Sequence, residues 1–136
     1  MIQPIEKDTF FLSQPSAEAI AEDVAVADDL LDTLKAHAEE CVGMAANMIG
    51  KNKRIIAFSD KGILYEMFNP IIIGREQPFE AEEGCLSLAG VRKVKRYRKI
   101  KILWMTRTFK PRVKNFEGWT AQIIQHEMDH LEGILI

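Results

Sequence analysis

The spacing of hydrophobic residues predicts two amphipathic α-helices, one towards each end of the chain. Over residues 26–40, apolar side chains recur every three or four positions with acidic residues between them, so they share one face of a helix that ends before Gly43. A second such pattern runs from Trp119 to about Leu131, and Gly133 is a typical helix terminator. Between these two segments the pattern changes.

The middle of the chain has the short apolar runs that are typical of β-strands. Turn-forming residues separate them at Asp60-Lys61-Gly62 and at Asn69-Pro70, and a further turn is expected through Pro111. The predicted strands are residues 53–58, 63–68, 70–75, 78–83, 91–96 and 98–106. This order, without alternating β-α-β units, predicts an α+β fold in which antiparallel β-sheets pack around the C-terminal helix. No linker-like segment is present, so we expect residues 1–136 to form a single domain.

Composition indicates a folded protein that does not cross a membrane. Hydrophobic residues make up 47% of the 136 residues and charged residues 28%, which excludes a disordered segment. No apolar run approaches the roughly 18 residues of a spanning helix. The N-terminus lacks a secretion signal, so the expected compartment is the cytoplasm. We therefore expect Cys41 and Cys85 to be free, catalytic or metal-binding rather than joined in a disulfide.

Charge is divided unevenly along the chain, although the formal net charge is only −2. Residues 1–40 are mainly acidic, and residues 92–114 are mainly basic. The basic segment could face an anionic partner such as a nucleic acid. We favour strands with one solvated, charged face that includes Arg96, because apolar residues such as Val94 and Ile102 recur at even spacing among the basic ones. No specific nucleic-acid partner is expected.

The segment Gln125-His126-Glu127-Met128-Asp129-His130 contains a His-Glu-x-x-His motif on the predicted C-terminal helix. Residues four apart lie on one helical face, so both imidazoles can reach a single metal ion while Glu127 flanks the water that reacts there. Two of the three histidines of the chain fall in this motif, which favours a metal site over two ordinary surface histidines.

A catalytic site of this kind usually takes a third protein ligand. Cys85, in Glu83-Gly84-Cys85-Leu86-Ser87, is the candidate, because Gly84 permits another backbone to approach closely. Taken alone, Cys85 would be read as a small buried apolar residue. With the two histidines it forms a soft donor set that suits Fe(II), Zn(II), Co(II) or Ni(II) rather than Mg(II) or Ca(II).

Three motifs together make the sequence resemble the peptide deformylases, metallohydrolases that remove the formyl group from the N-terminal methionine of nascent proteins. Besides the two motifs above, the third is Gly43-Met44-Ala45-Ala46-Asn47-Met48-Ile49-Gly50, and all three stand in the order of the family. The resemblance covers roughly residues 40–136.

The resemblance implies a role for each matching position. Cys85, His126 and His130 would hold one divalent metal, with Fe(II) expected in the cell. Glu127 would act as general base and then general acid, taking a proton from water and returning it to the departing amine. In this family the oxyanion of the intermediate is bound by the metal, by the backbone N–H at the position of Leu86, and by a glutamine of the first motif.

The chain departs from the family pattern at two positions. Met48 stands where the glutamine belongs, and a methionine has no N–H to donate. The loss of one oxyanion donor predicts a slower chemical step, by about 3 kcal/mol if nothing replaces it, and Gln125 and Asn47 are nearby candidates for that replacement. Cys41 stands where the family has its first glycine, and we interpret it as a thiol that lines the cleft.

The resemblance also implies how substrate is held. Val42 and Gly43 would pair with the main chain of the peptide as an added strand, with Gly84 beside them, and Ile123 would line the pocket for methionine. Glu83 and Asp129 would orient the ligands. The expected partners are N-formylmethionyl nascent peptides, with transient proximity to the ribosome and no membrane.

Two other functions compete with an active deformylase. One is a catalytically weak or inactive relative that keeps the metal and binds peptide N-termini, which the substitution at Met48 would permit. The other is a His-Glu-x-x-His endopeptidase, which uses the same water and base but usually a different third ligand, and Cys85 disfavours it.

Overall fold

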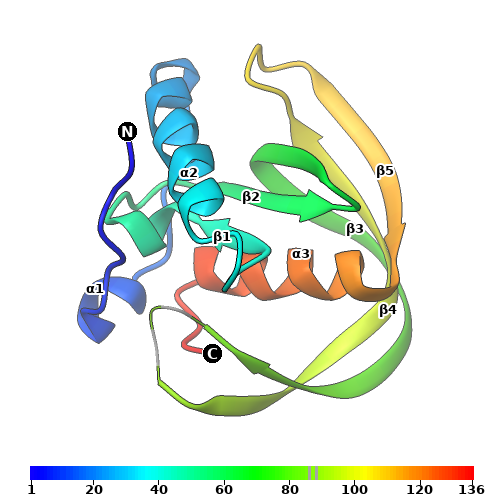
Figure 1. The fold of residues 1–136 in the computed structure, drawn as a ribbon. Coiled ribbons are helices and arrows are strands. Elements are labelled where there is room, and N and C mark those ends of the chain that lie inside the picture. Colours follow the sequence, from blue (N-terminus) through cyan, green and yellow to red (C-terminus); the bar gives the residue numbers. More distant parts are fainter. Residues whose placement is uncertain (86, 88) are drawn as a thin grey trace.

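A computed structural model describes the whole chain except residues 86 and 88. Its largest feature is one antiparallel sheet whose five strands follow each other in chain order (Figure 1). The strands are β1 (Gly43–Ala45), β2 (Ile55–Asp60), β3 (Ile63–Gly84), β4 (Val91–Met105) and β5 (Pro111–Glu117). The predicted α+β fold is confirmed, although it contains a single sheet in the described residues rather than several.

Helix α3 (Gly118–Leu131) lies in the hollow of this sheet, and the long β3–β4 ribbon curves around it (Figure 1). The prediction for this helix was correct to within one residue. Helix α2 (Val24–Ala36) is shorter than the predicted 26–40. The helix ends at Ala36 and is capped by His37, and Ala36 and Ala38 are exposed, so its apolar face makes no buried contact beyond Leu34. The remaining helical segments are short: α1 (Thr9–Leu12), η1 (Ala21–Asp23) and η2 (Ala46–Ile49).

The hydrophobic core lies on both sides of β2. Ile55, Ile56, Ala57 and Phe58 are all fully buried, and successive strand residues point to opposite faces. Both faces of this strand are therefore covered, and α2 and α3 each pack against it. No helix of the described residues is long and apolar enough to cross a membrane.

The strand boundaries differ from the prediction, and the predicted strands 63–68, 70–75 and 78–83 are all parts of the single strand β3. The expected turn at Asn69-Pro70 is a β-bulge, because Asn69 takes a left-handed conformation (φ 51°) and β3 shifts register there without ending. The Asn69 amide holds this bulge by accepting from the Ala19 N–H and donating to the Ala19 carbonyl. The predicted strands 91–96 and 98–106 form one strand, and β5 replaces the turn that was expected through Pro111.

The basic segment is mostly a strand face, with one important exception. Lys93, Lys95 and Lys99 of β4 lie directly opposite Glu82, Glu80 and Glu76 of β3, so the two strands balance each other's charge. This pairing supports the interpretation of a solvated strand face for these lysines. Arg96 was placed on that face wrongly: it is only 4% exposed and points towards α3.

Candidate metal centre

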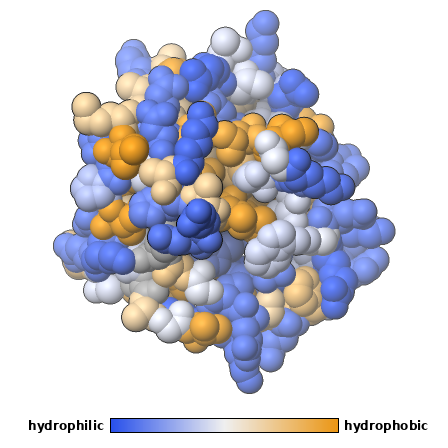
Figure 2. Space-filling view, viewed as in Figure 1, coloured by the Kyte–Doolittle hydropathy of each residue, from blue (hydrophilic) through white to orange (hydrophobic). Residues whose placement is uncertain are grey.

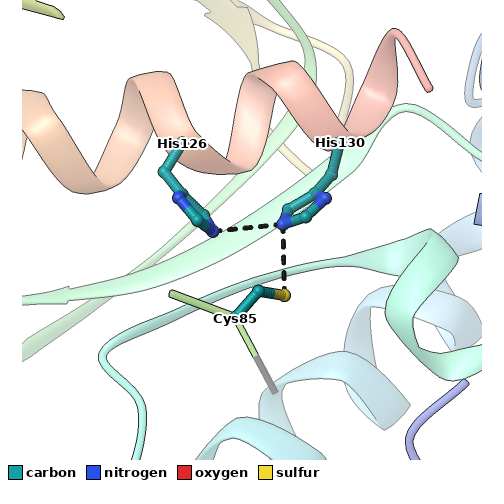
Figure 3. Close-up of side chains that lie close together, drawn as sticks. All are labelled: Cys85, His126 and His130. Carbon is teal, nitrogen blue, oxygen red and sulfur yellow. Dashed lines mark hydrogen bonds between the residues drawn. The ribbon is translucent and has the colours of Figure 1, made fainter. Parts of the chain in front are cut away.

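Helix α3 presents both motif histidines to one point, and the segment after β3 brings a cysteine to the same point. His126 and His130 project from α3 towards each other, with the sulfur of Cys85 opposite them (Figure 3). The Nε2 atoms of the histidines are 3.1 Å apart, and Cys85 Sγ is 3.4 Å from His130 Nε2. The three predicted ligands therefore converge, although Cys85 is 45 residues from His130.

The three donors fit a tetrahedral metal ion. For metal–ligand bonds of about 2.0–2.3 Å, the donor atoms of a tetrahedral site lie about 3.3–3.6 Å apart. The observed separations of 3.1 and 3.4 Å are close to this value, and all three donor atoms lie within 4.8 Å of one another. A thiolate with two imidazoles is a donor set for a borderline-soft divalent ion.

Hydrogen bonds fix the orientation of the ligands. The Nδ1 atom of His126 lies 2.8 Å from Glu83 Oε1, so an N–H there leaves Nε2 free to face the metal site. The backbone N–H of Ser87 donates to Cys85 Sγ at 3.4 Å. Burial alone would raise the pKa of Glu83, but hydrogen bonds from His126 and Arg96 lower it to about 2. Glu83 is therefore a permanent anion beside the ligand.

Glu127 has the environment of a general base. Its side chain is buried, and its Oε1 atom has no hydrogen-bond partner among the described residues. Burial is the largest cause that raises the pKa of Glu127 to about 7. A carboxyl group with a pKa near neutral can both accept and return a proton.

These groups open into a cavity of about 470 Å³. Figure 2 shows the face drawn in Figure 1, where hydrophobic and hydrophilic residues are interspersed and several hydrophobic side chains lie near the centre. The cavity is lined by all the predicted substrate contacts, by Met48 and by most of the predicted catalytic and ligand residues: Val42, Gly43, Met48, Gly84, Cys85, Ile123, His126 and Glu127. The predicted ligand His130 is buried and is not among the lining residues. The predicted donor at Leu86 lies outside the described residues.

Sequence reasoning missed several residues of this cavity. Trp119 and Gln122 line it from α3, and Glu40 and Glu82 line it from the chain before β1 and from β3. A helical projection could have found the first two, because they precede His126 by seven and four positions and so share its face. Nothing in the local sequence indicates the other two.

Cys41 also lines the cavity, as expected, but it lies outside the cluster of donor atoms described above. Its thiol donates to the carbonyl of Gly43. Burial is the main cause that raises the pKa of Cys41 to about 12, so the group stays a thiol at neutral pH.

Gly43 is required by a close approach between β1 and α3. A Cβ atom there would lie 2.6 Å from Ile123 Cγ2 and 3.0 Å from Glu127 Oε2. We expect Gly43→Ala to push α3 away, to destabilise the fold by about 1–3 kcal/mol, and to lower the activity through displacement of Glu127. Thermal unfolding and turnover measure the two effects. The control is Gly74→Ala on β3, where the closest neighbour is Lys101 Cβ at 3.3 Å and activity should be kept. Equal activity in both variants would contradict this role for Gly43.

Comparison with known proteins identifies the family. The family model for polypeptide deformylase matches residues 6–136. The chain belongs to the peptide deformylase family. A peptide deformylase of Clostridium beijerinckii is 54% identical to this chain over 136 residues, and the alignment covers the full length of both proteins.

Solved peptide deformylases share the fold. The Met-Ala-Ser-bound class I type b enzyme from Acinetobacter baumannii has a TM-score of 0.88 at 28% identity, covering 99% of this chain and 97% of that one. The peptide deformylase from Thermus thermophilus has a TM-score of 0.88 at 31% identity, and the match covers 99% of this chain and 83% of that one. The members of this family are metal-dependent amide hydrolases, so membership confirms the enzyme class predicted from the three motifs.

Proposed function

We propose that this protein removes the formyl group from the N-terminal methionine of newly made polypeptides in the cytoplasm, in transient proximity to the ribosome. The observation that carries this proposal is the convergence of three candidate metal-ligand atoms beside the buried carboxyl of Glu127, at a cavity that Cys85, His126 and Glu127 line. The Acinetobacter baumannii relative is described as bound to Met-Ala-Ser, a peptide that begins with methionine, which supports a peptide in this cavity. Residues 1–136 act as one domain.

Cys85, His126 and His130 are proposed to hold one divalent ion, Fe(II) in the cell, with Zn(II), Ni(II) or Co(II) as substitutes. When bound, this ion supplies a Lewis acid that activates water and polarises the formyl carbonyl. The donor set accepts all four ions, so metal analysis of protein purified without oxygen tests the choice.

Glu127 moves the proton in this proposal. Its carboxylate takes a proton from the attacking water, whose oxygen bonds to the formyl carbon. The C–N bond then breaks, and the same carboxyl returns the proton to the departing amine. Formate and a free N-terminal methionine are the products. Two observations support this role. Glu127 is buried, and its Oε1 atom has no hydrogen-bond partner among the described residues that would compete with water.

The substrate is proposed to bind mainly through its backbone. Strand β1 is an edge strand of the sheet, so the backbone of Gly43 can pair with an extended peptide. The carbonyl of Val42 accepts the Ser59 N–H of β2, so Val42 is proposed to contribute to substrate binding as part of the cavity wall. Gly84, the last residue of β3, also lines the cavity, and Ile123 supplies apolar surface for the methionine side chain. Recognition of this kind tolerates many sequences after the first residue, as nascent chains require.

The oxyanion is proposed to rely on fewer donors than is usual in the family. Met48 lines the cavity, and its Sδ accepts the Ala45 N–H at 3.4 Å. The two suggested replacements are engaged elsewhere: Gln125 binds the backbone of Tyr97 and Ala121, and the Asn47 amide donates to the His130 carbonyl. Of the two protein donors that the family resemblance implies, the backbone N–H of Leu86 is the one that this proposal keeps.

We expect Met48→Gln to raise kcat by about 100-fold, because the new amide can donate to the developing oxyanion. Its oxygen can also accept the Ala45 N–H that the sulfur accepts now. Steady-state kinetics with formyl-Met-Ala-Ser measure the effect. Met48→Leu is the control, since it keeps the volume without adding a donor. An unchanged kcat in Met48→Gln would show that another group already serves the oxyanion.

The activity itself is tested by formate release from formyl-Met-Ala-Ser, with protein loaded anaerobically with Fe(II) or loaded with Ni(II). We expect release that depends on Glu127. Release no greater than that of Glu127→Ala would overturn the proposal.

A second candidate is a weak or inactive relative that binds peptide N-termini, and the observation that favours it is Met48 in place of a donor. In that case peptide affinity would persist in Glu127→Ala and no formate would appear. Cleavage of an unblocked peptide would instead indicate an endopeptidase.

A further inference from the structure

Arg96 is a buried cation that binds Glu83, the hydrogen-bond partner of His126, and the mechanism above does not use it. Its side chain is 5% exposed. The guanidinium donates to both carboxylate oxygens of Glu83, with Nη2–Oε1 at 2.7 Å and Nε–Oε2 at 3.0 Å. It also donates from Nη1 to Asp129 Oδ2 at 2.7 Å. One rigid group therefore joins two carboxylates that lie on different elements.

The two carboxylates are neighbours of the metal ligands in the chain. Glu83 is near the end of β3, two residues before Cys85, and Asp129 is on α3, one residue before His130. Glu83 Oε1 is also 2.8 Å from His126 Nδ1. The contacts of Arg96 thus lead to the strand that carries the cysteine and to the helix that carries both histidines.

We propose that Arg96 is a positioning residue that sets the distance between the two halves of the metal centre and holds Glu83 against His126. This inference rests on the proposed metal-dependent function. The planar guanidinium holds Glu83 by two separate nitrogens and Asp129 by the third, and the single nitrogen of a lysine ammonium cannot reproduce this fixed geometry. With Glu83 held, His126 keeps its proton on Nδ1 and its lone pair on Nε2.

A second arginine of the chain, Arg107, makes the same kind of contacts as Arg96 but does not line the cavity. Arg107 donates to both oxygens of Glu66 on β3, at 2.9 and 2.6 Å, and to Asp28 on α2 at 2.8 Å. It therefore also joins a strand to a helix through a glutamate and an aspartate. Its side chain is 42% exposed, and neither partner lines the metal cavity.

The test compares Arg96→Lys with Arg107→Lys. We expect Arg96→Lys to weaken Co(II) binding by about 10- to 100-fold, as measured by competition with a coloured chelator, and to alter the Co(II) absorption spectrum. With formyl-Met-Ala-Ser, kcat should fall while KM stays the same. Arg107→Lys should keep the affinity and the spectrum of the original protein.

A purely structural role for Arg96 predicts a different result. Both variants would lose thermal stability in the metal-free state, while folded Arg96→Lys would bind Co(II) with the original affinity and spectrum. That outcome would overturn the inference. If Arg96→Lys does not fold, Asp129→Asn removes the charge that Arg96 binds on α3, and Asp28→Asn is its control. Unchanged Co(II) affinity and spectrum in Asp129→Asn would then overturn the inference.

Co(II) binding does not depend on formate release, so the two proposals can fail separately. Weaker Co(II) binding in Arg96→Lys, in a protein that releases no formate, would support the positioning role and reject the deformylase activity. Normal binding in an active enzyme would reject only the positioning role.

Discussion

Glu127→Gln is expected to lower kcat by about 100- to 10,000-fold, because the amide cannot take the proton from water. The side chains have the same shape, and the Oε1 atom of Glu127 has no hydrogen-bond partner in the described part of the chain, so the fold should be kept. KM should change little, since the peptide is held by other groups. Assays of formate release by metal-loaded protein measure the loss of kcat.

The matched control for this variant is Glu117→Gln, at the residue that directly precedes the same helix. Glu117 is exposed and does not line the metal cavity, so its variant should retain the original kcat. Circular dichroism and metal content should be the same for both variants. A Glu127→Gln protein that keeps more than about a tenth of the activity would contradict the role of general base.

Cys85→Ala is expected to remove stoichiometric metal binding and, with it, all measurable turnover, because two imidazoles alone leave the site one protein ligand short. Metal analysis after gel filtration measures the loss. Cys41→Ala provides the comparison, because Cys41 is also a half-buried cysteine of the same cavity. Cys41 lies outside the cluster of donor atoms formed by Cys85, His126 and His130.

Retention of metal in Cys41→Ala and its loss in Cys85→Ala would distinguish the two thiols. If both variants kept one metal per chain, Cys85 would not be a ligand. If both lost it, Cys41 would have a role that its hydrogen bond to the Gly43 carbonyl does not explain.

The parts of the site that sequence could predict are those encoded by local spacing. His126, Glu127 and His130 follow the period of a helix, and α3 spans Gly118–Leu131 as that period requires. Cys85 was named from the chemistry of a third ligand and from its place in the second family motif, since no helical or strand period connects it with α3. The approach of these two elements depends on the whole sheet.

The strand boundaries were less predictable because they depend on contacts distant in the chain. Asn69-Pro70 is a turn signal by composition, but the contacts of Asn69 with Ala19 hold it as a bulge inside β3. Only Phe116 of β5 is buried, so that strand has no alternating hydrophobic pattern and is defined by its pairing with β4.

Arg96 shows that a pattern can be read incompletely. The buried residues of β4 are even-numbered: Arg96, Ile100, Ile102 and Trp104. The alternation that identified the strand therefore also placed Arg96 on its inner face, and a buried arginine needs acidic partners. The identity of those partners, Glu83 and Asp129, could not be read from the sequence.

The separation of the ligands along the chain determines when the metal centre can form during folding. Cys85 follows the 22-residue strand β3, whereas His130 lies 45 residues further on, in a helix that must enter the hollow of the finished sheet. Contacts between such distant residues form late, because closing a long loop costs entropy before any contact is gained. Capture of a metal by the three proposed ligands therefore requires a docked α3: a molecule whose last helix has not docked has no site to load.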